Sequence, residues 1–130
     1  MIVNGQSVSA RSGLTLDVIS PINGELLTQL PNADAGDVDL AVAAARKSFD
    51  SGVWASMSPA ARRAVLLKWA DLIQAEALEL AVLGVRDNGT EISMAYKAEP
   101  LSAAGTIRYY AEAIDKIYGE VAPPHLIHSV

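Results

Sequence analysis

The 130-residue sequence contains no cysteine. This absence excludes a disulfide framework, cysteine-ligated zinc and thiol catalysis within the chain, and it is compatible with a reducing compartment. Aromatic residues are scarce at 5%, and charged residues reach only 19%, below the average of about 25%. A chain with so few charges and so many apolar residues, 51% in all, is predicted to be globular rather than disordered.

Basic residues are too few and too scattered for a phosphate-binding surface. The formal net charge is −5, and the isoelectric point is about 4.8. Binding to nucleic acid needs a concentrated basic face, so no nucleic-acid partner is expected. The adjacent pair Arg62-Arg63 falls on a predicted helix and is interpreted as part of a solvated helix face.

Long apolar runs are also missing, because no stretch approaches the roughly 18 residues that a membrane span requires. The first residues, Met1–Gly5, lack the basic and apolar regions of a secretory signal. We therefore expect a cytoplasmic protein with no membrane partner. The mean hydropathy is nevertheless positive, at +0.23, which predicts apolar surface that faces another chain or another part of the same protein.

The first 33 residues are predicted to form short strands and turns. Asn4-Gly5 is a hairpin dipeptide, and Ser12-Gly13 is a second turn signal. Residues 14–19 have strand composition, and residues 25–30 form a second run that Pro31 ends. Two small hairpins are the simplest arrangement, and they need helices to pack against.

From Asp34 onward the apolar residues recur with a helical period. Asp34 is a predicted N-cap for a helix over 35–50, and Ser58-Pro59 opens a second helix. That helical composition continues to Asn88-Gly89, so a break is expected near residues 75–77. Further helices are predicted at 91–98 and 100–118, divided by Pro100 and ended by Gly119. The fold class is therefore mostly α with a small β portion: two hairpins and four to five helices.

The helical stripes define a predicted core. Its members are Val42, Phe49, Leu66, Trp69, Leu72, Ile73, Ile107, Tyr110 and Ile114. If the Trp69 ring is buried, its replacement by alanine should cost about 3–5 kcal/mol.

No residue pattern predicts an active site. Tyr110 is expected to pack inward, with Tyr109 at an edge, rather than to form a stacking platform. His125 and His128 lack neighbouring ligands for a metal, and the serines lack a Gly-x-Ser-x-Gly context. Acidic pairs such as Asp37/Asp39 suit helix termini. Neither a Gly-x-Gly-x-x-Gly run nor a P-loop is present.

Five collinear segments resemble the NAD(P)-dependent aldehyde dehydrogenase family. Ser20–Glu25 is similar to its Asn-Pro-x-Thr-Gly-Glu turn, and residues 37–49 resemble its first helix. Trp54 with residues 58–73 resembles its second helix, and residues 79–89 its Glu-Leu-Ala…Asp-x-Gly stretch. The tract 108–123, from Arg108-Tyr109-Tyr110 to Pro123, completes the set and looks most like members acting on γ-glutamyl-γ-aminobutyraldehyde and related ω-amino aldehydes.

The resemblance implies oxidation of an aldehyde to a carboxylic acid with NAD or NADP. In the family a cysteine thiolate attacks the carbonyl, and a glutamate activates water. Both residues and the Rossmann strands come after the part of the family that these 130 residues resemble. The resemblance therefore implies no catalytic residue, no cofactor-binding residue and no bound cofactor in this chain, which is expected to be inactive alone.

The family also implies one metal site, in which backbone carbonyls of some members bind a monovalent cation. The corresponding positions here are Val18 and Asp115, and the third ligand would come from outside the chain. A local role for Asp115, as a cap or ion-pair partner near the helix end, is the alternative and the favoured reading. Gly89-Thr90 departs from the family's Gly-Lys at that point.

Residues 1–130 are thus expected to be one N-terminal segment: strands and turns over 1–33, helices over 34–119, and the start of a following connection or strand over 120–130. Its expected partner is the remainder of the dehydrogenase fold, or a second copy through exposed apolar surface. The alternative function is a non-catalytic helical interaction or assembly module.

Overall fold

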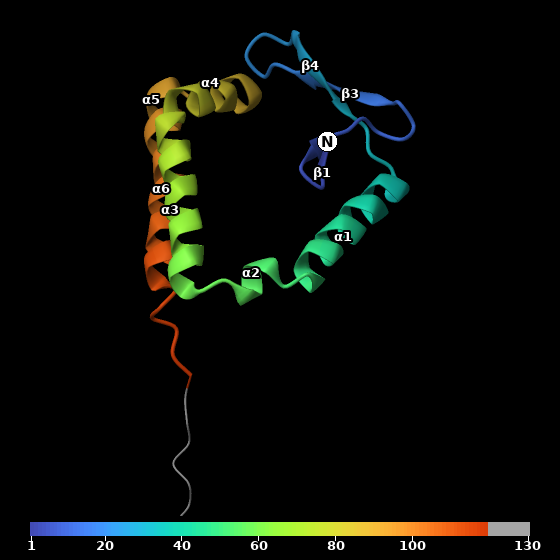
Figure 1. The fold of residues 1–130 in the computed structure, drawn as a ribbon. Helices are drawn as coiled ribbons and strands as arrows, with labels where there is room; N and C mark the ends of the chain where they lie inside the picture. Colours follow the sequence, from blue (N-terminus) through green and yellow to red (C-terminus); the bar gives the residue numbers. More distant parts are fainter. Residues whose placement is uncertain (120–130) are drawn as a thin grey trace, which may run out of the picture.

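The computed structural model describes residues 1–119, in which four short strands precede six helices (Figure 1). The strands are β1 (Ile2–Val3), β2 (Gln6–Ser7), β3 (Thr15–Ile19) and β4 (Leu26–Pro31). The helices are α1 (Ala35–Asp50), α2 (Val53–Ser56), α3 (Pro59–Ala75), α4 (Ala77–Asn88), α5 (Ile92–Ala98) and α6 (Pro100–Ala113). The predicted class, mostly α with a small β portion, is confirmed.

The two predicted hairpins are both present as separate antiparallel pairs, β1–β2 and β3–β4. Asn4 and Gly5 both have positive φ angles, 51° and 75°, as a two-residue hairpin turn of the primed type requires. In the second pair Thr15 lies opposite Pro31, and an irregularity in the register falls at Val18/Ile19. The Ser20 hydroxyl accepts the amide of Ile22 at 3.2 Å, and this bond stabilises the turn that follows β3.

Local sequence signals set most of the helix ends. The Asp34 side chain accepts the amide of Asp37 at 3.0 Å at the start of α1. The Ser58 hydroxyl accepts the amide of Ala61 at 3.2 Å at the start of α3. The predicted break between the second and third long helices falls at Glu76, which separates α3 from α4. Gly89 ends α4 in the left-handed region, with a φ of 77°.

Two elements differ from the sequence prediction. The four-residue helix α2 was not predicted, and Gly52 begins it with a φ of 68°. Helix α6 was predicted to reach residue 118 but ends at Ala113. The ammonium group of Lys116 donates a hydrogen bond to the carbonyl oxygen of Glu112, at 2.7 Å. A lysine that satisfies a C-terminal carbonyl is a recognised way to end a helix.

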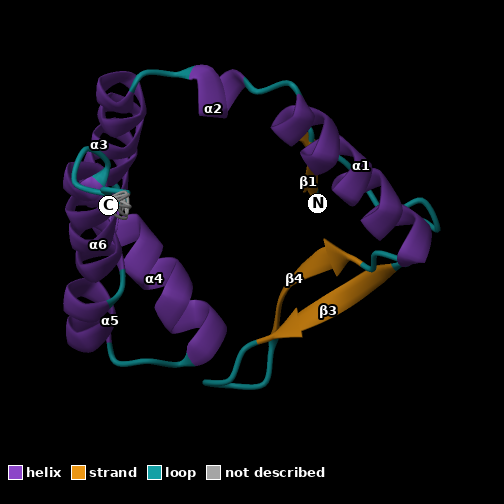
Figure 2. Cartoon of the chain, turned by 90° about the horizontal axis from the view of Figure 1, so that it is seen from below, coloured by secondary structure: helices purple, strands orange, loops and turns teal. Residues whose placement is uncertain are grey.

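The best-packed part of the molecule is the pair α3 and α6, which lie side by side in Figures 1 and 2. Alanines are buried along this pair, Ala70 on α3 and Ala104 and Ala111 on α6, and Pro100 is buried at the start of α6. Small side chains at a helix contact let the two helix axes approach closely. Two ion pairs flank the contact, Arg63 with Glu112 and Arg108 with Asp71.

The predicted core of large side chains was wrong. Five of its nine members are exposed: Val42, Phe49, Trp69, Leu72 and Tyr110. The other four, Leu66, Ile73, Ile107 and Ile114, are half-buried. The periodicity located an apolar stripe on each helix correctly, but a stripe is buried only where another element covers it. In residues 1–119 alanines fill the one extensive helix contact, and most of the large apolar stripes lie uncovered.

The elements follow one another around an open frame rather than around a common centre (Figure 2). Helix α1 contacts its neighbours α2 and β1, while the other helix contacts join α3, α4, α5 and α6. Both views place α1 on the opposite side of the frame from α3 and α6. The chain therefore presents extended apolar helix faces instead of enclosing them.

Candidate functional site

One depression lies between the β3–β4 hairpin and the end of α4. Its volume is about 550 Å³, and Val18 and Leu27 line one side while Leu83 and Asp87 line the other. Gly89 lies close to the hairpin turn, since a Cβ at that position would be 3.4 Å from Cγ of Pro21. Val18, the first residue that the resemblance assigned to a cation site, is half-buried here.

Asp115, the second assigned residue, belongs to a different depression. It lies just after α6 and lines a smaller depression with Ser58, Pro59 and Arg63. Figure 1 places the end of α6 and strand β3 at opposite ends of the frame. The structure therefore does not bring Val18 and Asp115 together, and the cation site stays a prediction. Among residues 1–119 no group of three or more potential metal ligands is present.

The surroundings of Asp115 form a small cluster of surface charges. Lys116 donates to the Asp115 carboxylate at 2.8 Å, and this hydrogen bond holds the pKa of Asp115 below its usual value and raises the pKa of Lys116. Arg63 Nη2 lies 2.6 Å from the Glu112 carboxylate, which raises the pKa of Arg63. The pKa shifts of Asp115, Lys116 and Arg63 all favour their charged forms, so the cluster serves ion pairing rather than proton transfer. The favoured local role for Asp115 agrees with this geometry.

A buried carboxylate joins the N-terminal segment to α1. Asp37 is 3% exposed, and its Oδ atoms accept the backbone amides of Arg11, at 3.2 and 3.3 Å, and of Asp34, at 3.1 Å. The sequence interpretation placed Asp37 only at a helix terminus. The spacing Asp34-x-x-Asp37 resembles a capping box and could have indicated the reciprocal bonds, but the long-range contact with Arg11 has no local signal.

Arg62 is the second residue that sequence reasoning misjudged. The interpretation of Arg62-Arg63 as one solvated face holds for Arg63 and is wrong for Arg62, which is half-buried. Its Nε atom is buried and has no hydrogen-bond partner within the described part of the chain. No carboxylate of residues 1–119 pairs with it either. A buried cationic donor without an acceptor is uncommon in folded proteins.

The tyrosine pair is on the surface. Tyr109 and Tyr110 are 71% and 63% exposed, so the expectation that Tyr110 packs inward was wrong. Their rings contact each other edge to face, with centroids 5.3 Å apart. His125 and His128, and the expected strand or connection over 120–130, lie outside the described residues.

Exposed apolar area is the dominant property of the molecule. The chain exposes 10,234 Å², whereas a folded monomer of 13.7 kDa exposes about 6,600 Å². Even when residues 120–130 are set aside as fully extended chain, at about 1.45 Å² per dalton, roughly 2,000 Å² of excess remains. That area per partner corresponds to a large, obligate interface. Within residues 1–119 no helix is both long enough and apolar enough to span a bilayer.

Comparison with known proteins identifies the kind of molecule to which these helices belong. Residues 8–129 match the model of the aldehyde dehydrogenase family. The chain therefore belongs to the aldehyde dehydrogenase family, as the five collinear segments indicated.

Individual relatives agree with this assignment. The NADP/NAD-dependent aldehyde dehydrogenase PuuC of Escherichia coli is 42% identical over 94% of this chain and 25% of its own length. The aminoacetaldehyde dehydrogenase of Pseudomonas aeruginosa is 41% identical over 93% of this chain and 24% of its own length. The crystal structure of γ-glutamyl-γ-aminobutyraldehyde dehydrogenase from Burkholderia cenocepacia J2315 superposes with a TM-score of 0.91, at 44% identity, over 95% of this chain and 25% of that one. The chain thus spans about a quarter of these relatives.

Proposed function

We propose that this chain forms the N-terminal part of an NAD(P)-dependent aldehyde dehydrogenase that oxidises an ω-amino aldehyde to a carboxylic acid. The observation that carries the proposal is the match itself, because nearly the whole chain superposes on a γ-glutamyl-γ-aminobutyraldehyde dehydrogenase with a TM-score of 0.91 at 44% identity. Two relatives whose names refer to NADP/NAD or to aminoacetaldehyde support the cofactor and the substrate class.

Within this function the chain contributes structure rather than chemistry. A dinucleotide site is usually built from parallel strands and a glycine-rich turn at a helix N-terminus. The strands of residues 1–119 pair only in antiparallel fashion, and the full sequence has no cysteine to supply a thiolate. These residues do not suit a dinucleotide, so no step of the oxidation is assigned to them.

The proposal predicts that the isolated chain does not oxidise aldehydes. Purified chain is mixed with NAD⁺ or NADP⁺ and an aminoaldehyde, and the absorbance of the reduced cofactor is followed. No change above a buffer control is expected. Steady turnover would show that the chain carries its own catalytic groups.

A chimera tests whether the chain can serve as the N-terminal part of a working dehydrogenase. The 130-residue chain replaces the matching first quarter of E. coli PuuC, and cofactor reduction is measured with an aminoaldehyde and with a simple aliphatic aldehyde as the comparison. We expect a folded chimera that reduces the cofactor, with the aminoaldehyde preferred. A chimera that fails to assemble with the PuuC remainder would contradict the assignment of this chain as an N-terminal dehydrogenase part.

The second candidate is a non-catalytic interaction or assembly module. The exposed large apolar side chains of α1, α3 and α4 favour it, because uncovered area of this size drives association in water. Light scattering over a concentration series separates the candidates at the level of the isolated chain. Concentration-dependent growth in mass supports association between copies, while a monomer at every concentration with no hydrophobic-dye binding contradicts it.

A further inference from the structure

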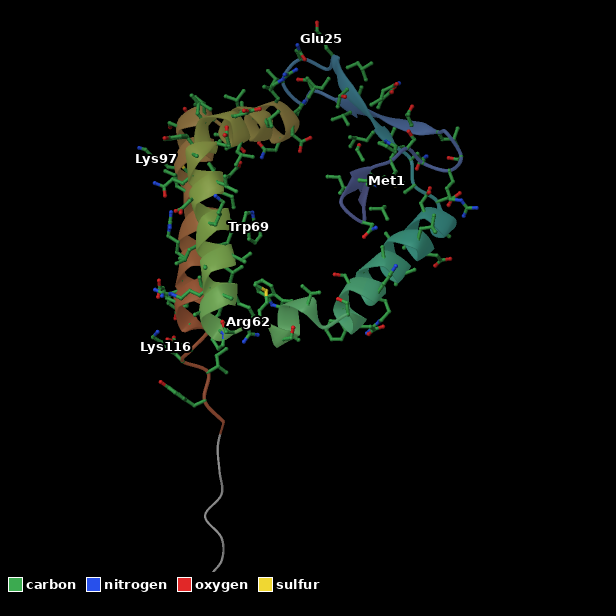
Figure 3. All side chains as sticks on the ribbon, in the orientation of Figure 1. Met1, Glu25, Arg62, Trp69, Lys97 and Lys116 are labelled. Carbon is green, nitrogen blue, oxygen red and sulfur yellow. The ribbon has the colours of Figure 1, made fainter. Side chains whose placement is uncertain are left out.

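One side of α3 combines exposed apolar side chains with a half-buried arginine whose Nε donor is unpaired within residues 1–119. Val65, Trp69 and Leu72 are 47%, 54% and 54% exposed, and their spacing of four and three residues places them along one side of the helix. Arg62 lies about one turn before Val65 and about two turns before Trp69, so it belongs to the same side. We call these four residues the open face of α3. Figure 3 shows the labelled Trp69 and Arg62 on the side of α3 toward the centre of the frame.

Arg62 and Arg63 are neighbours in the sequence with opposite surroundings. Arg63 points toward α6, and its Nη2 atom lies 2.6 Å from the Glu112 carboxylate. Arg62 points elsewhere, and its buried Nε atom has no acceptor within residues 1–119. The Arg63 guanidinium is therefore used within the α3–α6 pair, whereas the Arg62 Nε donor has no acceptor within residues 1–119.

An unpaired buried donor on a cation is costly, because burial removes water without replacing its hydrogen bond. Arginine also presents its donors in a planar fork that suits carbonyl and carboxylate oxygens. A segment that covers the apolar neighbours and supplies an acceptor, toward which the half-buried Arg62 side chain turns, would remove this cost. The position thus favours an oxygen-bearing partner flanked by apolar side chains.

The size of the uncovered surface and the length of the relatives indicate what covers the open face of α3. Roughly 2,000 Å² of excess surface corresponds to a permanent interface rather than to a transient contact. The relatives extend over about four times the length of this chain. We propose that Arg62 is the polar anchor of the open face and donates to a carbonyl or carboxylate oxygen of the dehydrogenase segment that covers α3. This inference rests on the proposed function.

The experiment compares the same substitution in two contexts, the isolated 130-residue chain and the chimera with the PuuC remainder. Arg62→Met removes the donors and keeps much of the apolar stem, and Arg62→Lys keeps the charge but removes the Nε donor. In the isolated chain neither substitution should lower the denaturation midpoint. In the chimera both should lower it by about 2 °C, since a hydrogen bond to a charged group is lost in a protein about four times the length of this chain.

Arg63→Met is the matched control, because the acceptor of Arg63 lies on α6 of the same chain. It should have the same effect in both contexts. Arg62 substitutions that are harmless in both contexts, or equally harmful in both, would overturn the anchor while leaving the proposed function intact. A wild-type chimera that does not assemble would instead overturn the proposed function, and the anchor with it.

Discussion

At the scale of single residues, polar groups with a defined partner hold the described structure together. Asp37 accepts backbone amides from two segments that are far apart in the sequence, and Glu91 does the same locally at the start of α5. Both are acidic residues at helix N-termini, where unpaired amides and the helix dipole favour negative charge. They differ in burial, since Asp37 is buried and Glu91 is exposed.

Asp37→Ala is expected to destabilise the chain by about 1–3 kcal/mol, because it removes the charged acceptor of two part-buried hydrogen bonds, from the amides of Arg11 and Asp34. Urea denaturation followed by circular dichroism measures the loss. Asp39→Ala is the control, since Asp39 lies in the same part of α1 but is exposed. Equal stability of the two variants would show that the Asp37 bonds contribute little.

Glu91 predicts a local response to pH. Its carboxylate accepts the Ser93 hydroxyl and the amides of Ser93 and Met94, and the bonds to Ser93 are the main reason that its pKa lies below the usual value. A lowered folded-state pKa stabilises the folded form above the unfolded-state pKa, and this contribution is lost as pH falls through the folded value. Acidification below the usual range for glutamate should therefore fray the start of α5.

Nuclear magnetic resonance of the Ser93 and Met94 amides follows this transition directly. Their shifts should titrate with a midpoint below that of an ordinary glutamate, and Glu91→Gln should remove the transition. Titration at the usual glutamate value would mean that the cap is not formed in solution.

At the scale of elements, sequence signals located boundaries far better than burial. The caps at Asp34 and Ser58 and the end of α4 at Gly89 depend on groups within a few residues, so the sequence contains all the information. The end of α6 depends on how Lys116 folds back, and α2 is too short to show a period. Burial depends on what lies opposite each stripe, which a single helix pattern does not reveal.

Within the α3–α6 pair, substitution of a small buried alanine should therefore cost more stability than truncation of the large but exposed Trp69. Ala111→Leu adds volume at a fully buried position and should cost about 1–3 kcal/mol by overpacking the helix contact. Trp69→Ala should cost less than that in the isolated chain, because its side chain is 54% exposed. This replaces the expectation of about 3–5 kcal/mol for a buried ring.

Chemical denaturation of both variants beside the parent checks this order. Ala103→Leu, at an exposed position on α6, is a control for helix propensity and added volume. A Trp69→Ala loss larger than the Ala111→Leu loss would mean that the open face is covered in solution.

At the scale of the whole molecule, the positive mean hydropathy was the sequence feature that best anticipated the structure. It predicted apolar surface facing something outside the packed elements, and the open frame presents such surface on α1, α3 and α4. The predicted cation site had no comparable support, because its residues came from the family resemblance and not from any pattern in this sequence. Long-range placement is decided by how the hairpin and α4 pack, as for Val18 and Asp87, which line the same depression.

The open face makes Trp69 a reporter of assembly. The chain has only two tryptophans, so Trp54→Phe leaves Trp69 as the single tryptophan of the isolated chain, and in the chimera the tryptophans of the PuuC remainder are also replaced by phenylalanine. In the isolated chain its exposed ring should emit at long wavelength and be quenched readily by acrylamide. In the chimera with the PuuC remainder, covering of α3 should shift the emission to shorter wavelength and slow the quenching several-fold. Urea-unfolded protein supplies the limit of full exposure in both contexts. Identical emission and quenching in the isolated chain and in an active chimera would show that α3 presents a different side to the rest of the enzyme.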